Sequence, residues 1–303
     1  MDEGRLDAFA AIGMTRASLG VQDFDPKVQK AINREQSFAL TQTVVEGVRA
    51  RGVRSLNLDL LYGLPHQTME SLESTIDQAL LLSPDRIALF GYAHVPWFKK
   101  HQTMIDEAAL PGPEARLAQQ QLAGGLIEKA GYQPIGFDHF AKPDDTLAAA
   151  ARAGRLRRNF QGYTDDGCET LIGLGPSSVS RFRQGYAQNT PAINIYSSQV
   201  ENGGLATARG IALSEEDRAR AWVIERLMCD LAFSRAEAES RFGGIGLRLV
   251  AEAEALAAEE PDLITQSGDL YHIPAEARVL VRAVAARFDA YLAKGNARHS
   301  VAV

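Results

Sequence analysis

Apolar runs and helical runs alternate along the first third of the chain, and this alternation leaves few folds open. The apolar runs cover residues 16–22, 55–62 and 86–92. Runs in which apolar side chains recur at helical spacing cover residues 2–12, 37–51 and 69–82. Strands that alternate with helices are joined by crossover connections, which favour parallel pairing and cover both faces of the sheet. The sequence therefore predicts an α/β fold with a parallel sheet.

The rhythm of the sequence changes after about residue 110. The pattern then predicts helices over 114–130 and 144–153, strands over 133–141 and within 169–178, and a basic loop over 154–164. From Ser214 onward the chain is mainly helical, and its helices with a short strand-turn-strand segment resemble a winged-helix domain. We therefore expect three parts, which cover residues 1–110, 111–213 and 214–303.

Composition and charge exclude several classes of protein. With 46% hydrophobic and 23% charged residues, the chain is neither disordered nor fibrous. Its net charge of −6 gives no general attraction for nucleic acid or anionic membranes. The winged-helix-like part has 15 acidic against 11 basic residues, which argues against DNA binding. No run of 18 apolar residues occurs and the N-terminus is acidic, so we expect neither a membrane span nor a signal peptide, and a cytoplasmic location.

Polar or small residues stand where each predicted strand ends. Gln22 ends the first strand, Asp59 lies late in the second, and Ala93 follows the third. The carboxyl ends of parallel strands meet at one edge of a sheet, where α/β proteins bind their ligands. These residues are therefore expected to share one site. The alternative is that Gln22 and Asp23 only cap the helix that begins at Asp25, and that Asp59 bonds to a loop.

Asp59 carries the strongest single indication of a ligand. Leucines flank it on both sides, so its carboxylate is expected to be buried, which is costly unless the group is paired or hydrogen-bonded. A ligand amine or a ribose diol would satisfy it. Arg34 would suit a ligand carboxylate because its guanidinium is a planar double donor. The alternative for Arg34 is an ion pair with Glu35 or Asp25.

Three weaker patterns leave functional and structural interpretations open. The segment GLGPSS at 173–178 would suit a phosphate, although a tight turn explains its glycines at least as well. His94, Asp138 and His139 have side chains used in acid–base catalysis, but a single histidine is more often a bonded structural group, and their spacing predicts no metal site. A basic cluster suits either a substrate with carboxylates or a solvated loop; it consists of Arg155, Arg157 and Arg158.

Six segments follow one another in a characteristic order. They read LGVQDFDPKVQKAINREQ, NLDLLYGLPHQT, YAHVP, GYQPIGFDHFAKPDD, RNFQGYT and GLGPSSVS. Together they resemble the oxygen-independent coproporphyrinogen III oxidase (coproporphyrinogen dehydrogenase) family of radical S-adenosylmethionine (SAM) enzymes, from about residue 2 to the C-terminus. The resemblance implies that residues 1–110 form the C-terminal half of a partial, TIM-like parallel βα barrel and that residues 111–213 extend it near the substrate.

The resemblance also implies an activity, cofactors and site residues. Enzymes of this family use a [4Fe–4S] cluster and two SAM molecules to decarboxylate two propionates of coproporphyrinogen III oxidatively, which gives protoporphyrinogen IX for haem synthesis. Five residues fall on the family's SAM-contacting positions: Gln22, Arg34, Asp59, Ala93 and Val179. Val179 stands where the family usually has isoleucine. The resemblance implies no nucleic-acid or membrane partner, and a monomer for the full-length enzyme.

The sequence departs from the family at the iron–sulfur cluster. The family binds its cluster through a CxxxCxxC loop, whereas this chain has only Cys168 and Cys229, which cannot supply three converging thiolates. We therefore expect a truncated chain without a metal site of its own, which does not catalyse the reaction alone. We also expect an open edge at the strand over 16–22, and self-association through it. Two alternatives stay open, namely a haem-binding, chaperone-like relative and a non-catalytic remnant.

Overall fold

A computed structural model describes residues 1–160 and 162–292. The chain divides into two compact units, of which the first comprises Met1–Leu156 and the second begins at Arg157. The finer division into three parts at residues 110 and 213 stays a prediction.

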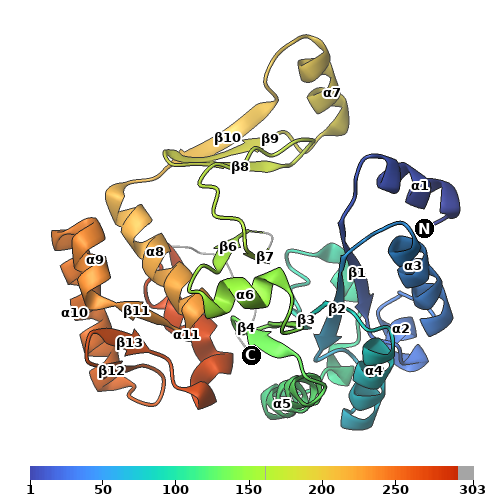
Figure 1. Cartoon of the computed structure of the whole chain (residues 1–303), viewed down its shortest axis with the longest axis horizontal. Helices are drawn as coiled ribbons and strands as arrows, with labels where there is room; N and C mark the ends of the chain where they lie inside the picture. The colour runs from blue at the N-terminus through green and yellow to red at the C-terminus, as the bar shows by residue number, and fades with distance from the viewer. Residues whose placement is uncertain (161, 293–303) are drawn as a thin grey trace. The chain divides into compact units, whose positions relative to one another are not determined.

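The first unit is built on a five-stranded mixed sheet. Strands β1 (Arg16–Gln22), β2 (Ser55–Tyr62) and β3 (Arg86–Gly91) lie side by side and pair in parallel, as the sequence predicts (Figure 1). The single strand expected over 133–141 is wrong: a turn at Gly136 divides it into β4 (Gln133–Ile135) and β5 (His139–Ala141), which pair antiparallel. Because β5 also pairs antiparallel with β3, the sheet is mixed rather than purely parallel. In the described residues its order is β1-β2-β3-β5-β4, without closure into a barrel.

Helices begin where the sequence places capping side chains. The Asp25 carboxylate accepts hydrogen bonds from two backbone N–H groups of α2, and the hydroxyls of Ser37 and Thr68 each accept from one backbone N–H of α3 and α4. The helical elements of this unit are α1 (Glu3–Ala11), α2 (Pro26–Ala31), α3 (Phe38–Ala50), α4 (Met69–Leu81), η1 (Lys100–Met104), η2 (Glu107–Ala109), α5 (Pro113–Lys129) and α6 (Thr146–Arg152).

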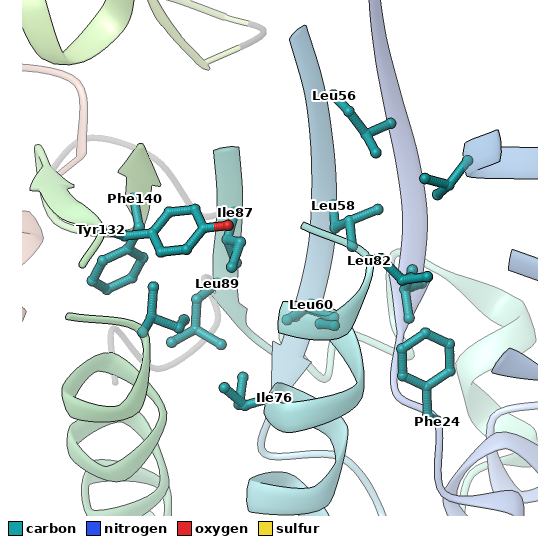
Figure 2. Close-up of a cluster of buried hydrophobic side chains, with 14 of the residues drawn as sticks. Phe24, Leu56, Leu58, Leu60, Ile76, Leu82, Ile87, Leu89, Tyr132 and Phe140 are labelled. Atoms are coloured by element: carbon teal, nitrogen blue, oxygen red, sulfur yellow. The ribbon is translucent and has the colours of Figure 1, made fainter. Parts of the chain in front are cut away.

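One face of the sheet forms the core of this unit. Alternate residues of the central strands, among them Leu58 and Ile87, are fully buried against apolar side chains of α3, α4 and α5 (Figure 2). Along the middle of the strands the other face carries polar or small side chains, namely Ser18, Gly20, Asn57, Asp59, Arg86, Ala88 and His139, and the apolar pair Leu61 and Phe90 follows on the same face. The two faces of the sheet therefore differ, because one is apolar throughout and the other is polar or small along the middle of its strands.

Strand β1 lies at one edge of the described sheet. The open side of an edge strand is a template for pairing with another chain, because its backbone N–H and C=O groups there lack ladder partners. We predict that the purified chain self-associates as its concentration rises. Sedimentation velocity at increasing concentration measures this, and a chain that stays monomeric throughout would contradict the prediction.

The second unit begins with two antiparallel assemblies of short strands. Strands β6 (Arg157–Asn159) and β7 (Gly162–Thr164) pair in the region expected to be a basic loop. A three-stranded sheet follows, formed by β8 (Val179–Phe182), β9 (Gly185–Asn189) and β10 (Thr207–Ala212), with α7 (Ile193–Glu201) between the last two. Between β7 and β8, the segment expected to be a strand and turn has only an isolated bridge, from Leu171 to Arg181.

The remaining described residues form a small α/β assembly around a cluster of aromatic rings. Trp222, Tyr271 and Phe288 each contact Phe233, with ring centroids 5.3–6.3 Å apart. The elements are α8 (Glu215–Asp230), β11 (Ala232–Ser234), α9 (Arg235–Phe242), α10 (Gly244–Glu259), β12 (Thr265–Ser267), β13 (Leu270–His272), η3 (Ala275–Leu280) and α11 (Val281–Ala286). The last helix, expected over 275–293, is thus a 3₁₀ turn followed by a short α-helix, and the end of that prediction lies outside the described residues. None of the helices described is long and apolar enough to cross a bilayer.

Candidate functional site

A row of residues in register crosses the polar face of the first unit's sheet. Gly20 pairs with Asp59, Asp59 with Ala88, and Ala88 with His139. Paired residues on neighbouring strands present their side chains on the same face. The two small residues of the row, Gly20 and Ala88, each stand beside Asp59 and add almost no side-chain bulk next to its carboxylate.

The Asp59 carboxylate is half-buried and held by two neighbouring polar side chains. It accepts hydrogen bonds from Asn57 Nδ2 at 2.6 Å and from Ser18 Oγ at 3.3 Å. Burial raises the pKa of Asp59 above its usual value, although both hydrogen bonds and the charges of His139 and Arg34 oppose that shift. A carboxylate with two oxygens and remaining acceptor capacity suits a hydroxyl or amine of a ligand. The prediction that Asp59 is hydrogen-bonded is confirmed, whereas its predicted burial is met only in part.

Gln22 and Arg34 meet over Gly20. Arg34 Nη2 donates a hydrogen bond to the Gly20 carbonyl at 2.6 Å. A Cβ atom on Gly20 would lie 2.8 Å from Gln22 Nε2 and 3.1 Å from Arg34 Nη2, so only glycine lets the amide and the guanidinium approach this closely. Since Gly20 pairs with Asp59, three of the five predicted SAM-contacting residues gather around this glycine.

A bulge in β1 determines where the Gln22 amide lies. The register passes from Gly20 opposite Asp59 to Gln22 opposite Leu60, so β1 has one extra residue there. Gln22 adopts a positive φ of 71°, an unusual conformation for a residue with a side chain. Sequence periodicity carries no signal for this bulge.

Ala93 lies two residues beyond the end of β3 and is exposed. Its carbonyl accepts a hydrogen bond from Gln102 Nε2 at 3.0 Å, and Gln102 Oε1 in turn accepts from the Val95 N–H at 2.6 Å. The buried Gln102 side chain thus fixes the loop after β3. Ala93 follows the same edge of the sheet at which β1 and β2 end.

Val179 belongs to the second unit, where it begins β8 and pairs with Gln188. Its contact with a cofactor stays a prediction.

Asp23, beside Gln22, has a structural role. Its fully buried carboxylate accepts hydrogen bonds from Gln67 Nε2 at 2.6 Å, Thr75 Oγ1 at 2.9 Å and the Asp25 N–H at 2.6 Å. Asp25, not Asp23, accepts the N–H groups of α2. Asp23 therefore has a structural role, as the alternative proposed, but it does not cap the helix. It connects the end of β1 to α4.

We predict that Asp23→Ala lowers the free energy of unfolding by about 1–3 kcal/mol, because it leaves buried donors without their acceptor. Denaturation followed by circular dichroism measures the change. Asp77→Ala, which removes an exposed carboxylate from α4, is the matched control and should have little effect. Equal effects of the two substitutions would contradict the structural role of Asp23.

The weaker patterns mostly prove structural. His94 lies between the Tyr92 hydroxyl, 3.2 Å from Nδ1, and Glu107, 3.0 Å from Nε2. In the segment 173–178, the N–H groups of Gly173 and Gly175 donate to the hydroxyls of Ser180 and Tyr196, which leaves these donors occupied without a phosphate.

The sequence contains only a weak indication that His139 belongs to the candidate site. Its Nδ1 lies 2.6 Å from Asp138 Oδ1, and its ring makes an edge contact with Phe90. Ser18 and Asn57, which hold Asp59, went unnoticed for a related reason. The strand register is what places Ser18 and His139 on the same face as Asp59. Asn57 lies two residues before Asp59 in the same strand, so strand alternation alone could have identified it.

The two cysteines belong to the second unit, whereas the residues around Gly20 belong to the first. Cys168 is exposed and Cys229 is buried, and burial raises the pKa of the Cys229 thiol to about 12. Among the residues described, no three His, Cys, Asp or Glu side chains converge as metal ligands.

Sequence comparisons agree on one family. Residues 1–79 match the model of the radical SAM superfamily. The oxygen-independent coproporphyrinogen III oxidase of Paracoccus denitrificans is 49% identical over 292 residues, which are 96% of this chain and 64% of that protein. Its counterpart in Cereibacter sphaeroides is 48% identical over 301 residues, which are 99% of this chain and 67% of that protein. The chain thus spans about two thirds of the length of these relatives.

A solved structure agrees with the sequence comparisons. The coproporphyrinogen III oxidase of Escherichia coli, described as a radical SAM enzyme, matches with a TM-score of 0.89 and 39% sequence identity, over 96% of this chain and 68% of that one. Identity at this level over nearly the whole chain accompanies a common fold. The chain therefore belongs to the family of oxygen-independent coproporphyrinogen III oxidases.

Proposed function

We propose that this chain provides the SAM-binding wall and substrate-binding parts of an enzyme that converts coproporphyrinogen III to protoporphyrinogen IX without oxygen, in haem synthesis. Membership of the family supports the reaction class. The three parallel strands, whose polar face carries the Asp59 row, support the proposal that the first unit is part of a radical SAM barrel. The helices and the three-stranded sheet after Ser214 support a winged-helix-like C-terminal domain.

The groups around Gly20 fit SAM. SAM carries a carboxylate, an amine and a ribose diol, and when bound and reduced it supplies the deoxyadenosyl radical. Arg34 would bind its carboxylate, Asp59 would accept from its hydroxyl or amine groups, and the Gln22 amide would donate or accept beside them. The close approach of Gln22 and Arg34 over Gly20 is the observation that carries the proposal. Ala93 and Val179 complete the proposed set of SAM-contacting residues.

The iron–sulfur cluster does not fit the residues of this chain. Its sequence has only Cys168 and Cys229, one exposed and one buried. A [4Fe–4S] cluster needs converging thiolates that these two residues do not supply. We therefore assign the chain no residue that holds the cluster.

The proposal is tested by SAM binding to the full 303-residue chain, measured by isothermal titration calorimetry. We predict that SAM binds and that Arg34→Gln weakens the binding about tenfold, because a charge-assisted double donor is lost. Arg54→Gln, which removes an exposed arginine beside β2, is the control and should leave the affinity unchanged. After anaerobic treatment with iron and sulfide, this chain alone should not form deoxyadenosine. Absence of SAM binding, or equal effects of the two substitutions, would contradict the proposed pocket.

A further inference from the structure

The two members of the basic cluster that begin the second unit, Arg157 and Arg158, have different surroundings. Arg157 pairs with Glu225, with 3.5 Å between Nη1 and Oε2. Arg158 takes part in none of the ion pairs of the described residues, and only its backbone N–H reaches Glu225, at 3.1 Å. The two neighbours therefore have different roles, although the sequence presents them as one cluster.

The Arg158 guanidinium lies over an aromatic ring instead of a carboxylate. It lies 5.5 Å from the centre of the Tyr163 ring, and the Tyr163 hydroxyl is anchored by donating to the Met228 carbonyl at 2.8 Å. The Arg158 Nε atom is buried and has no hydrogen-bond partner within the described chain. A partly buried guanidinium with an unsatisfied donor lowers the stability of the fold. This arrangement points to an anionic ligand that would accept from the guanidinium.

Arg158 opens onto a pocket of about 200 Å³ between β6, α8 and α11. Four apolar side chains line it, namely Ile224, Met228, Ala285 and Ala286. Its charged lining consists of Arg158, Arg282 and Asp289, and Asp289 Oδ1 accepts from the Tyr291 N–H at 2.8 Å. The pocket thus combines two guanidinium groups and one carboxylate with the four apolar side chains, so that positive charge exceeds negative charge in its lining.

We propose that this pocket binds the carboxylate of a short aliphatic arm. The planar Arg158 guanidinium suits a carboxylate through paired N–H donors, and the Tyr163 ring lies 5.5 Å from it. The four apolar side chains suit methylene groups better than a fully solvated inorganic anion. Propionate arms of coproporphyrinogen III have this chemistry, and that choice of source rests on the proposed function.

The experiment titrates the 303-residue chain and its variants with coproporphyrin III, the stable oxidised porphyrin with the same propionate arms, and follows porphyrin fluorescence. Arg158→Gln should weaken binding about tenfold. Ala286→Leu, which fills the pocket and keeps every charge, should weaken it to a similar extent. Arg155→Gln removes an exposed arginine of the same segment and should leave the affinity unchanged. Sodium propionate should compete with the porphyrin more effectively than inorganic phosphate. Circular dichroism and thermal melts confirm that each variant is folded.

Several outcomes overturn the pocket. They are no binding of coproporphyrin III, equal losses for Arg158→Gln and Arg155→Gln, no effect of Ala286→Leu, or competition by phosphate at least as strong as by propionate. SAM titrations of the same variants separate this proposal from the proposed function. If coproporphyrin III binding depends on Arg158 while SAM does not bind, the pocket proposal is supported and the proposed SAM site is contradicted. If SAM binds while coproporphyrin III binding does not depend on Arg158, only the pocket proposal is contradicted.

Discussion

Replacing Leu58 by alanine is expected to lower the free energy of unfolding by about 2–5 kcal/mol. Leu58 is fully buried at the centre of β2, in register with Leu19 on β1 and Ile87 on β3 (Figure 2). Truncation removes apolar contacts and leaves a cavity that the surrounding β-strands and helices fill only in part. Chemical denaturation followed by circular dichroism measures the loss.

The control for this substitution is Leu81→Ala at the end of α4. Leu81 is 77% exposed, so the same chemical change there should cost less than about 0.5 kcal/mol. If Leu58→Ala were as mild as Leu81→Ala, the assignment of this sheet face to the core would be wrong.

Replacing Asp59 by asparagine is expected to weaken SAM binding about tenfold to a hundredfold without destabilising the fold. Asp59 neighbours Leu58 in β2 but lies on the opposite face, where its carboxylate would accept from SAM. Asparagine keeps an oxygen for Asn57 and Ser18 and removes the charge, so charge-assisted hydrogen bonds to the ligand are lost. Calorimetric titration with SAM measures the loss, and Asp77→Asn, on an exposed helix surface, is the matched control.

The same variant has a defined effect on the pH dependence of stability. Burial raises the pKa of Asp59 in the folded chain, so the folded state holds this proton at pH values where the unfolded state has released it. Stability from this group is fully present below the unfolded pKa and is lost as the pH rises through the folded pKa. In Asp59→Asn this pH-dependent loss of stability is absent, because asparagine does not titrate. The difference in unfolding free energy between variant and wild type should therefore grow in favour of the variant as the pH rises through that window.

Subtracting the two stability curves isolates Asp59, because Asp23, whose pKa burial also raises, is present in both proteins. A difference that stays flat with pH would contradict the raised pKa, and wild-type SAM affinity in Asp59→Asn would contradict the site.

Sequence periodicity predicted the first three strands because each is a compact apolar run with clear terminators. Strands β1 and β2 have the predicted bounds, and β3 ends one residue early, at Gly91. Strand β10 went unpredicted because every one of its residues is exposed, so it shows no alternation. The turn at Gly136 was missed because a single glycine inside the segment QPIGFDHFA is also compatible with one continuous strand.

The candidate site was predictable in its parts but not in its connections. Partial burial of Asp59 follows from its leucine neighbours, Gln22 was indicated by its place at a strand end, and Arg34 by its guanidinium, with the family resemblance pointing to the same residues. The contacts among these residues depend on strand register and on Gly20, which the sequence does not encode as a local pattern. Arg157 and Arg158 look equivalent in the sequence because only the fold gives one of them a carboxylate partner.

The extra residue in β1 matters to anyone who would transplant this arrangement onto another scaffold. Grafting the side chains at regular strand spacing would place the Gln22 amide opposite Leu61 rather than Leu60, a displacement of roughly 3.3 Å along the strand. A designer would therefore have to copy the left-handed backbone at Gln22 together with Gly20, two residues before it. The irregularity of the backbone is as much a part of this recognition surface as its chemical groups.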